Sequence, residues 1–228
     1  MKYLLPIIML GALVLFSSCG DFYTFEESES TDGLTMRVER DTAYVMVGDR
    51  MPMHVNFSPQ APEGLPVYWL PVSEDTAVAF VVNDTLMALC EGEMDMVAFG
   101  AAGTLRDTCH VIVIDRWQAD PRDAWQDMVY YARVTVGGRD FDPSQMIVAA
   151  FNGSTVAGIG EWKEWAGIGY VQLRVFLDTE SLPDSVRAPI TVRCYDRSTF
   201  SVYRSSDDLY FDGEAHGTLS NLLPLNLR

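Results

Sequence analysis

The amino-acid sequence predicts an all-β protein built from two tandem β-sandwiches. Between residues 34 and 228, short segments of alternating apolar and polar residues are separated by turn residues, without a sustained helical period. Strands at this spacing are typical of antiparallel sandwiches. The alternation pauses at residues 116–127, which separates a first domain at 34–115 from a second at 116–228.

The first domain contains strands that can be placed from their alternation and turns. Met51, Met53 and Val55 alternate with polar residues or proline, which predicts a half-buried strand. Asn83-Asp84 suits a tight turn between two strands. The expected strands are 51–58, 78–82, 86–90, 95–100 and 108–114, with the last two joined across 101–106.

The first domain contains a set of short motifs, which are Val47-Gly48-Asp49, Trp69, Thr76-Ala77-Val78-Ala79, Leu86-Met87-Ala88, Glu91-Gly92 and 107–113. Together these motifs resemble the bacterial immunoglobulin-like domain of group 2. The resemblance covers about a third of the chain and implies an immunoglobulin-like sandwich in which Trp69 is a core residue. Asn83-Asp84 departs from the glycine that this family usually has in the turn.

The second domain shows the same kind of pattern after a short junction. Asp120-Pro121 is suited to begin one helical turn over 122–126. Gly137-Gly138 and Asn152-Gly153 predict tight turns. The expected strands include 130–136, 146–151, 155–159, 171–177 and 190–194.

The second domain contains a series of loose motifs, which are Trp117, Asp120-Pro121, Met128, Ala132, Val134, Ala149-Ala150-Phe151, Gly158, Tyr195-Asp196, 211–217, Leu219, Ser220 and Pro224. Together these motifs resemble a β-domain that recurs in surface and secreted proteins of Gram-negative bacteria. The resemblance implies a non-catalytic accessory or adhesion module.

The N-terminal segment has the features of a secretion signal. Lys2 is followed by a mostly apolar run at 4–16, and Ser17-Ser18 leads into Cys19. The run is shorter than the about 20 apolar residues that a bilayer span needs. Residues 1–18 resemble a bacterial lipoprotein signal peptide, which implies that Cys19 is acylated and anchors the mature chain. An ordinary cleaved signal or an uncleaved anchor helix is the alternative.

Charge limits the range of partners. The formal net charge is -16, so a nucleic-acid ligand is not expected, and membrane attachment is expected through the lipid anchor rather than through basic residues. Residues 19–33 contain many acidic, serine and threonine residues and no basic one, which predicts a flexible tether whose like charges repel one another. We expect a lipid-anchored outer-membrane protein at the cell surface.

The remaining cysteines allow one disulfide at most if Cys19 is acylated. Cys90 and Cys109 could pair in an oxidising compartment. Both lie in apolar strand-like segments, however, so the sequence favours two buried thiols. Cys194 is the third cysteine that remains besides Cys19.

No catalytic or metal-binding motif stands out. His54, His110 and His216 do not have the spacing of metal ligands. Gly158-Ile159-Gly160 and Gly167-Ile168-Gly169 lack the helix of a phosphate-binding loop and are better explained as strand glycines. The acid pairs Asp140/Asp142 and Asp207/Asp208 have no complete calcium-loop pattern. We therefore expect neither enzymatic activity nor a cofactor, with a hydrolase in the second sandwich as the rival hypothesis.

The best binding candidates are Trp162 and Trp165 in Glu161-Trp162-Lys163-Glu164-Trp165. They could form an aromatic tip that stacks on a sugar or enters a partner's pocket, or they could fold back as an apolar lid. A separate signal is the Asp-Ser/Thr-apolar triplet, which resembles an O-glycosylation acceptor and also has an ordinary turn explanation. The candidate acceptors are Thr42, Thr76, Thr85 and Ser185.

From these features we expect a non-catalytic cell-surface lipoprotein with a binding or adhesion role toward a protein or glycan. The alternative is a glycan-binding accessory lipoprotein of a polysaccharide uptake system.

Overall fold

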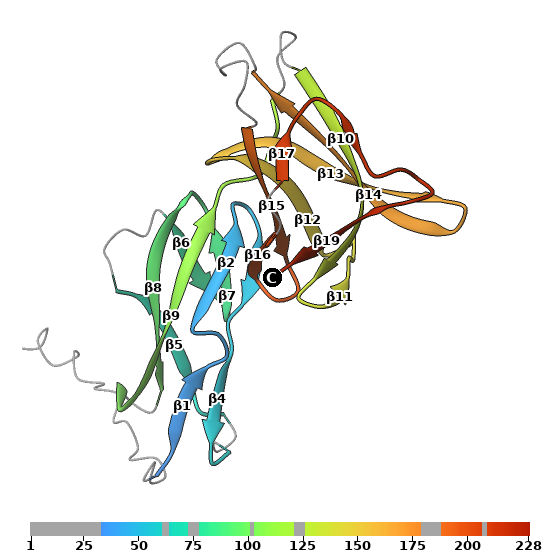
Figure 1. Cartoon of the computed structure of the whole chain (residues 1–228). Helices are drawn as coiled ribbons and strands as arrows, with labels where there is room; N and C mark the ends of the chain where they lie inside the picture. Colours follow the sequence, from blue (N-terminus) through green and yellow to red (C-terminus); the bar gives the residue numbers. More distant parts are fainter. Residues whose placement is uncertain are drawn as a thin grey trace, which may run out of the picture. The chain divides into compact units, whose positions relative to one another are not determined.

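Strands account for almost all regular structure in the computed structural model (Figure 1), which describes residues 33–60, 64–72, 78–100, 103–120, 126–178, 188–206 and 209–228. Within these ranges there is no α-helix, and the strands form two sandwiches, each with a hydrophobic core. The predicted all-β class is confirmed. The signal segment 1–18 and all of the tether except Gly33 lie outside the described residues, as do residues 122–125 of the expected helical turn.

The first sandwich has the immunoglobulin-like strand arrangement. Its strands are β1 (Thr35–Val38), β2 (Thr42–Met46), β3 (Arg50–Pro52), β4 (Val55–Ser58), β5 (Val67–Pro71), β6 (Ala79–Val82), β7 (Thr85–Ala88), β8 (Gly92–Gly100) and β9 (Leu105–Ile114). One layer has the order β2-β9-β8-β5, and the other contains the β1-β4 and β3-β7-β6 sheets. The chain changes layer between β1 and β2, β2 and β3, β4 and β5, β5 and β6, and β7 and β8, so both layers contain strands from the whole length of the domain, as in immunoglobulin-like sandwiches.

Most expected strands of this domain are present, with one difference. The alternation from Met51 to Ser58 is divided between β3 and β4, because β3 pairs with β7 whereas β4 pairs with β1. The Asn83-Asp84 turn is confirmed, with φ of 49° and 55° at its two residues. Trp69, a core residue according to the family resemblance, is only partly buried and packs against the core.

The second sandwich is a continuous series of paired strands. They are β10 (Gln126–Val136), β11 (Arg139–Asp140), β12 (Met146–Asn152), β13 (Thr155–Trp165), β14 (Ile168–Leu177), β15 (Ala188–Asp196), β16 (Ser201–Arg204), β17 (Leu209–Phe211), β18 (Ala215–His216) and β19 (Leu223–Leu227). The order β10-β14-β13-β12-β15 is antiparallel throughout. β13 belongs to both layers, since its first half pairs with β12 and its second half pairs with β14.

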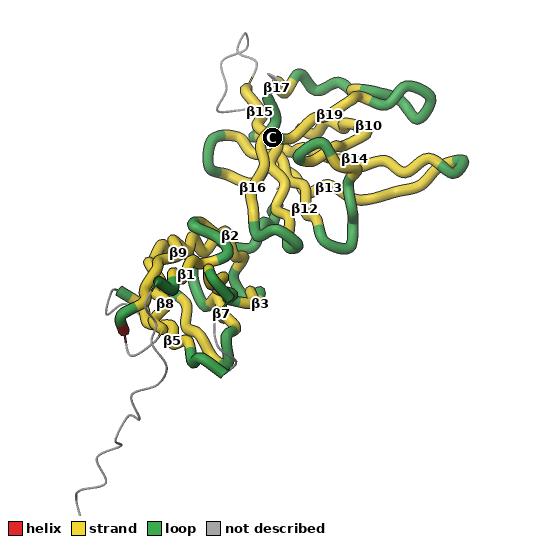
Figure 2. The backbone as a smooth tube through the Cα atoms, turned by 90° about the horizontal axis from the view of Figure 1, so that it is seen from below, coloured by secondary structure: helices red, strands yellow, loops and turns green. Residues whose placement is uncertain are grey.

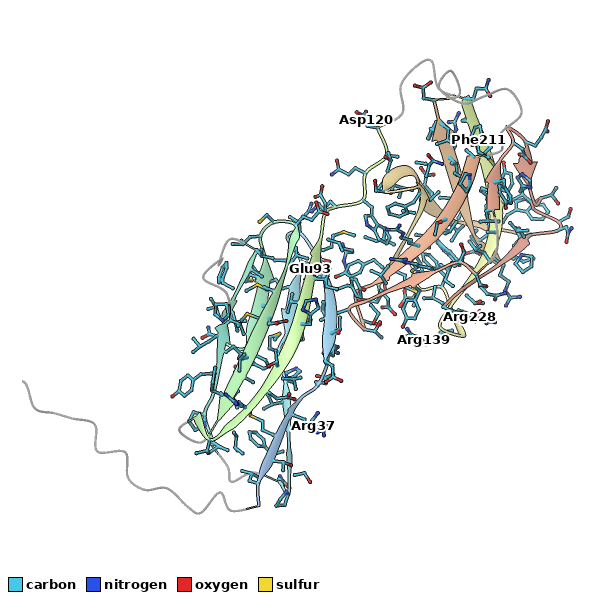
Figure 3. The ribbon with its side chains drawn as sticks, turned by 60° about the vertical axis from the view of Figure 1, so that its left-hand side comes forward. Arg37, Glu93, Asp120, Arg139, Phe211 and Arg228 are labelled. Carbon is cyan, nitrogen blue, oxygen red and sulfur yellow. The ribbon has the colours of Figure 1, made fainter. Side chains whose placement is uncertain are left out.

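The two ends of this series meet. β18 and β19 run parallel to β10, and β16 pairs with β15. Arg204 and Arg228 then exchange two backbone hydrogen bonds of 2.9 Å, beside a bridge between Ser205 and Leu227. Figure 3 shows Arg139 and Arg228 at the end of the sandwich opposite to Phe211.

Alternation in the sequence correctly identifies the inner face of this sandwich. Tyr130, Ala132, Val134 and Val136 are buried in its core. Gly158 is a strand glycine, because a Cβ there would overlap the backbone carbonyl of Arg174. The strand must therefore carry glycine at this close approach.

The turn between β15 and β16 contacts the first sandwich. The Phe200 side chain belongs to the first core, although this residue comes from the second half of the chain, and its carbonyl accepts a 2.8 Å hydrogen bond from the Tyr44 N–H. Arg197 Nε donates a 2.8 Å hydrogen bond to Asp49 Oδ2. Residues 34–228 form one compact unit.

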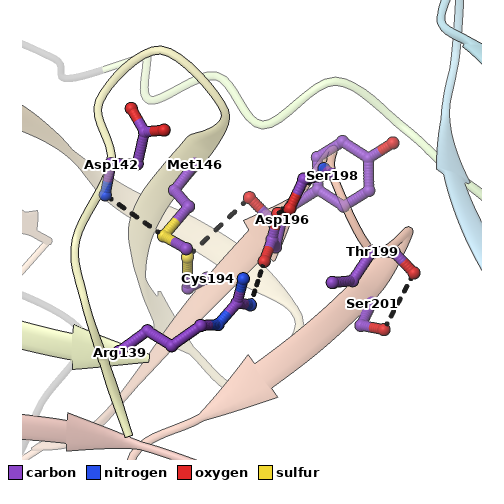
Figure 4. Close-up of polar contacts among 9 residues, drawn as sticks. Arg139, Asp142, Met146, Cys194, Asp196, Ser198, Thr199 and Ser201 are labelled. Carbon is purple, nitrogen blue, oxygen red and sulfur yellow. Dashed lines mark hydrogen bonds and ion pairs between the residues drawn. The ribbon is translucent and has the colours of Figure 1, made fainter. Parts of the chain in front are cut away.

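A buried carboxylate holds this turn (Figure 4). Asp196 is fully buried and accepts hydrogen bonds from Arg139 at 2.6 Å and from the Ser198 N–H and hydroxyl at 2.8 and 2.6 Å. Burial by itself would raise the pKa of Asp196, but the bonds from Ser198 and Arg139 outweigh burial and lower the pKa below its ordinary value. The ionised form therefore stabilises the turn.

None of the cysteines Cys90, Cys109 and Cys194 forms a disulfide. The prediction of a buried thiol is correct for Cys109 and wrong for Cys90, which is exposed because it follows the end of β7. Burial raises the pKa of Cys109 to about 11 and that of Cys194 to about 12. Both buried residues therefore remain protonated thiols at neutral pH.

Candidate functional site

The candidate site is a gap between two strands of the second sandwich. β10 and β14 are paired as far as Ala132 and Val171 and then separate. Beyond this point β10 turns back into β11, and β14 pairs only with β13. The two hairpins leave between them a hollow of about 400 Å³, which we call the notch. It is lined by Arg133, Val134, Asp140, Phe141, Trp162 and residues 167–169.

Trp162 forms an apolar wall of the notch. It lies opposite Val171 on the core-facing side of the β13–β14 hairpin, yet 42% of its surface is exposed. Figures 1 and 2 show that this hairpin extends beyond the rest of the sandwich. The Trp162 ring rests on Gly169, where a Cβ would overlap it, and its centroid is 5.6 Å from that of Phe141. The remaining ring surface is available to a ligand.

The walls of the notch also present backbone polar groups. In an antiparallel ladder, alternate residues direct their N–H and C=O toward the same neighbour. Val136 pairs with Arg139 across the β10–β11 turn, so its backbone N–H and C=O point toward β11. Val134 lies two residues earlier and directs its own N–H and C=O toward the same side of β10, into the notch. Ile168 pairs with Trp165 across the β13–β14 turn, so its backbone N–H and C=O point toward β13. Gly169 is the next residue and directs its N–H and C=O to the other side of β14, also into the notch. Among the described strands, neither residue has a ladder partner on that side.

A pair of opposite charges lies at the rim. Arg133 and Asp140 are 70% and 84% exposed, and the shortest distance between guanidinium nitrogen and carboxylate oxygen is 3.8 Å. An exposed pair this loose contributes little to stability. Both groups therefore remain able to form hydrogen bonds with a bound molecule.

The structure separates the two tryptophans that the sequence singled out. Trp165 lies opposite Ile168, on the other face of the hairpin from Trp162, and is 49% exposed. It does not line the notch. Sequence reasoning missed Phe141 and Arg133 as neighbours of Trp162, since they come from the β10–β11 region. The glycine pair at 167–169 was the one available signal, because glycine in a strand marks a close approach.

A larger hollow of about 870 Å³ lies between residues 114–118 and the β12–β13 turn. Arg193 lies over the Phe151 ring at 4.2 Å, and its Nε is buried without a hydrogen-bond partner. Desolvation and the nearby Arg204 lower the pKa of Arg193. The lining has charges of both signs, because Arg116 and Arg193 are accompanied by Glu91, Asp115 and Asp120. These charges define no single class of ligand.

His110, His216 and Asp142 are used in local contacts. His110 Nδ1 lies 2.7 Å from Asp95, and His216 Nε2 lies 2.9 Å from Asp212. Asp142 accepts hydrogen bonds from the Ser144 N–H and hydroxyl, as in a turn. Within the described ranges, no three His, Cys, Asp or Glu side chains gather in a way that could hold a metal ion.

The candidate modification sites are only partly described. Thr42 is exposed at the start of β2, and the Thr85 hydroxyl donates a 3.3 Å hydrogen bond to the Asn83 carbonyl. Cys19, Thr76, Ser185 and the Asp207/Asp208 pair lie outside the described residues. In the part of the chain that is described, no helix has the length and hydropathy needed to cross a bilayer.

No protein-family model matches the chain, and no curated protein matches its sequence. Among solved structures, extracellular cadherin domains 1–4 of protocadherin gamma B7 align over 79% of this chain and 50% of their own, at 11% identity and a TM-score of 0.31. Domains 4–9 of the surface layer protein SbsC align over 81% of this chain and 31% of their own, at 13% identity and a TM-score of 0.30. This chain thus spans half or less of these two structures.

Domains 5–6 of SbsC align over 81% of this chain and 98% of their own, at 13% identity and a TM-score of 0.29. Similarity at this level carries no argument about function. The fold assignment rests on the strand pairing described above.

Proposed function

We propose that this chain is a non-catalytic cell-surface lipoprotein that binds a ligand in the notch of its second sandwich. The observation that carries the proposal is Trp162, a large aromatic ring held half exposed beside unpaired backbone groups and two charged side chains. Ligand sites typically combine an apolar wall with a few polar groups, and the volume of the notch lies within the range of such sites. Cys19 would place this site at the outer membrane surface.

Substituting the two tryptophans tests the site with a built-in control. Trp162→Ala removes the wall of the notch, whereas Trp165→Ala removes a somewhat more exposed ring from the opposite face of the same hairpin. We expect binding of whole cells or glycans by the purified full chain to be lost in the first variant and kept in the second. Equal loss in both variants would contradict a site in the notch.

The lipid anchor needs its own experiment. We expect Cys19→Ala to leave the sandwiches folded but to move the chain from the membrane fraction to the soluble fraction, as followed by immunoblotting. Mass spectrometry of the native chain should show the added acyl groups. A Cys19→Ala chain that stays in the membrane fraction would require a different anchor.

The second candidate is a glycan-binding accessory lipoprotein of a polysaccharide uptake system. It is favoured by the pairing of Trp162 with donor and acceptor groups, because sugars present apolar C–H faces together with hydroxyls. The rival hypothesis of a hydrolase would require chain cleavage. Incubating the full chain with a panel of polysaccharides and measuring new reducing ends would detect that activity.

A further inference from the structure

We infer that the notch takes the terminal pyranose of a neutral glycan, end-on, rather than an internal stretch of a sugar chain. The inference rests on the proposed function, because it concerns the ligand of the same site. It is carried by the shape of the notch, by its unpaired backbone groups and by its balance of charge.

The shape of the notch suits the end of a chain. At its inner end the gap is closed by the β10–β14 ladder, which begins at Ala132 and Val171. Its sides are the β10–β11 and β13–β14 hairpins, and Phe141 and Trp162 close it toward the core. An internal sugar residue is bonded on two sides and needs a groove that is open at both ends. A terminal residue needs only one open side, and the gap is open between its hairpins beyond the last paired residues.

The polar groups of the notch match the hydroxyls of a sugar ring. Each hydroxyl can both donate and accept a hydrogen bond. Val134 and Gly169 each direct one N–H and one C=O into the gap, and Asp140 and Arg133 add an acceptor and a donor at the rim. The Trp162 face can stack on the C–H groups of the same ring. These groups account for both the polar and the apolar surface of a pyranose.

The charge of the site favours a neutral sugar. Arg133 and Asp140 cancel each other at the rim, and they are the only charged residues in the described lining. The chain as a whole has a net charge of -16, which repels a polyanionic glycan. Uronate-rich or sulfated chains are therefore poor ligands for this site.

An extended peptide fits the notch less well. A peptide that is added to a sheet gains its affinity from a row of main-chain hydrogen bonds. Each wall of the notch offers the backbone groups of one residue, Val134 or Gly169, so a ladder of the usual length cannot form.

The test is a length series measured by isothermal titration calorimetry on the purified full chain. The probes are methyl glycosides of glucose, galactose and mannose, their linear di- to hexasaccharides, and an oligogalacturonate as the charged comparison. We expect at least one neutral methyl glycoside to bind, and the Kd to change by no more than about threefold along its series. The oligogalacturonate should bind at least about tenfold more weakly.

Substitutions of the two tryptophans test whether the measured sugar binding takes place in the notch. Trp162→Ala should weaken binding by about tenfold or more, as expected for loss of an aromatic contact, and Trp162→Phe should restore part of it. Trp165→Ala should stay within about twofold of the wild type. Thermal unfolding of each variant separates loss of binding from loss of folding.

The outcomes distinguish the inference from the function on which it rests. If affinity rises more than about tenfold with chain length while Trp162→Ala still abolishes binding, the site binds internal sugars, and only the end-on inference fails. Preferred binding of the oligogalacturonate would overturn the neutral class. If no sugar binds but the chain still adheres to cells through Trp162, the glycan ligand is wrong and the binding role stands. If Trp162→Ala affects neither kind of binding, the proposed site itself is wrong.

Discussion

Two turns of the second sandwich hold a non-glycine residue at the same left-handed backbone angle. Ala166, between β13 and β14, and Phe200, between β15 and β16, both have a φ of 52°. Phe200 is 7% exposed and packs in the first core, whereas Ala166 is exposed at the tip beside the notch. The same backbone strain is therefore offset by burial in one turn and left uncompensated in the other. One hairpin supports the fold, and the other is free to support a ligand site.

The largest expected effect is that of removing the buried ring. Phe200→Ala should lower the free energy of unfolding by about 3 kcal/mol, because it empties a place in the first core. Urea unfolding of the full chain measures this loss. Trp165→Ala is the control at an exposed aromatic residue, and it should lower the free energy of unfolding by less than about 1 kcal/mol. Equal losses would show that the two hairpins do not differ as described.

A smaller effect is expected from the carboxylate that holds the β15–β16 turn. At pH 7, Asp196→Asn should cost about 2 kcal/mol, since the charged hydrogen bonds from Arg139 and Ser198 are weakened. The pKa of Asp196 is lower in the folded state, so its stabilisation is present above the unfolded pKa of about 3.9 and is lost as the pH falls through the folded value.

The difference between wild type and Asp196→Asn should therefore stay constant from pH 7 to about 5 and shrink below pH 4. Urea unfolding at several pH values checks this dependence. A difference that grows on acidification would mean that the carboxylate is not held in its charged form.

The smallest expected effect has the opposite sign. Ala166→Gly should stabilise the chain by up to about 1 kcal/mol, because glycine adopts the left-handed conformation without the strain that alanine has there. The corresponding Phe200→Gly change should still destabilise, since the lost burial exceeds the relieved strain. Chemical denaturation of the two glycine variants side by side tests the comparison directly.

Much of the fold could be predicted from the sequence because alternation depends on local burial. The inner faces of β10 and β14 and the Asn83-Asp84 and Gly137-Gly138 turns lie where the pattern places them. The division of the strand at 51–58 could not be predicted, because it depends on which neighbour each half pairs with. The exposure of Cys90 could not be predicted either, since an apolar segment does not show where its strand ends.

The candidate site shows the same limit. Trp162 could be singled out as an aromatic residue among charges, but its seat on Gly169 and its contact with Phe141 depend on pairing and on the splay of β10 from β14. The spacing of three residues between Trp162 and Trp165 already implies opposite faces if the segment is a strand. The expected strand at 155–159 ends before both tryptophans, however, and only the structure shows that β13 continues to Trp165.

The sequence by itself determined the all-β class and the buried faces, because both follow from the order of apolar and polar residues along short segments. Tertiary structure decided which strands meet, where β10 and β14 separate, and that Phe200 is buried in the core of the other sandwich. These features depend on contacts between residues that are distant in the chain. No local pattern encodes such contacts, and they place Trp162 beside an open notch.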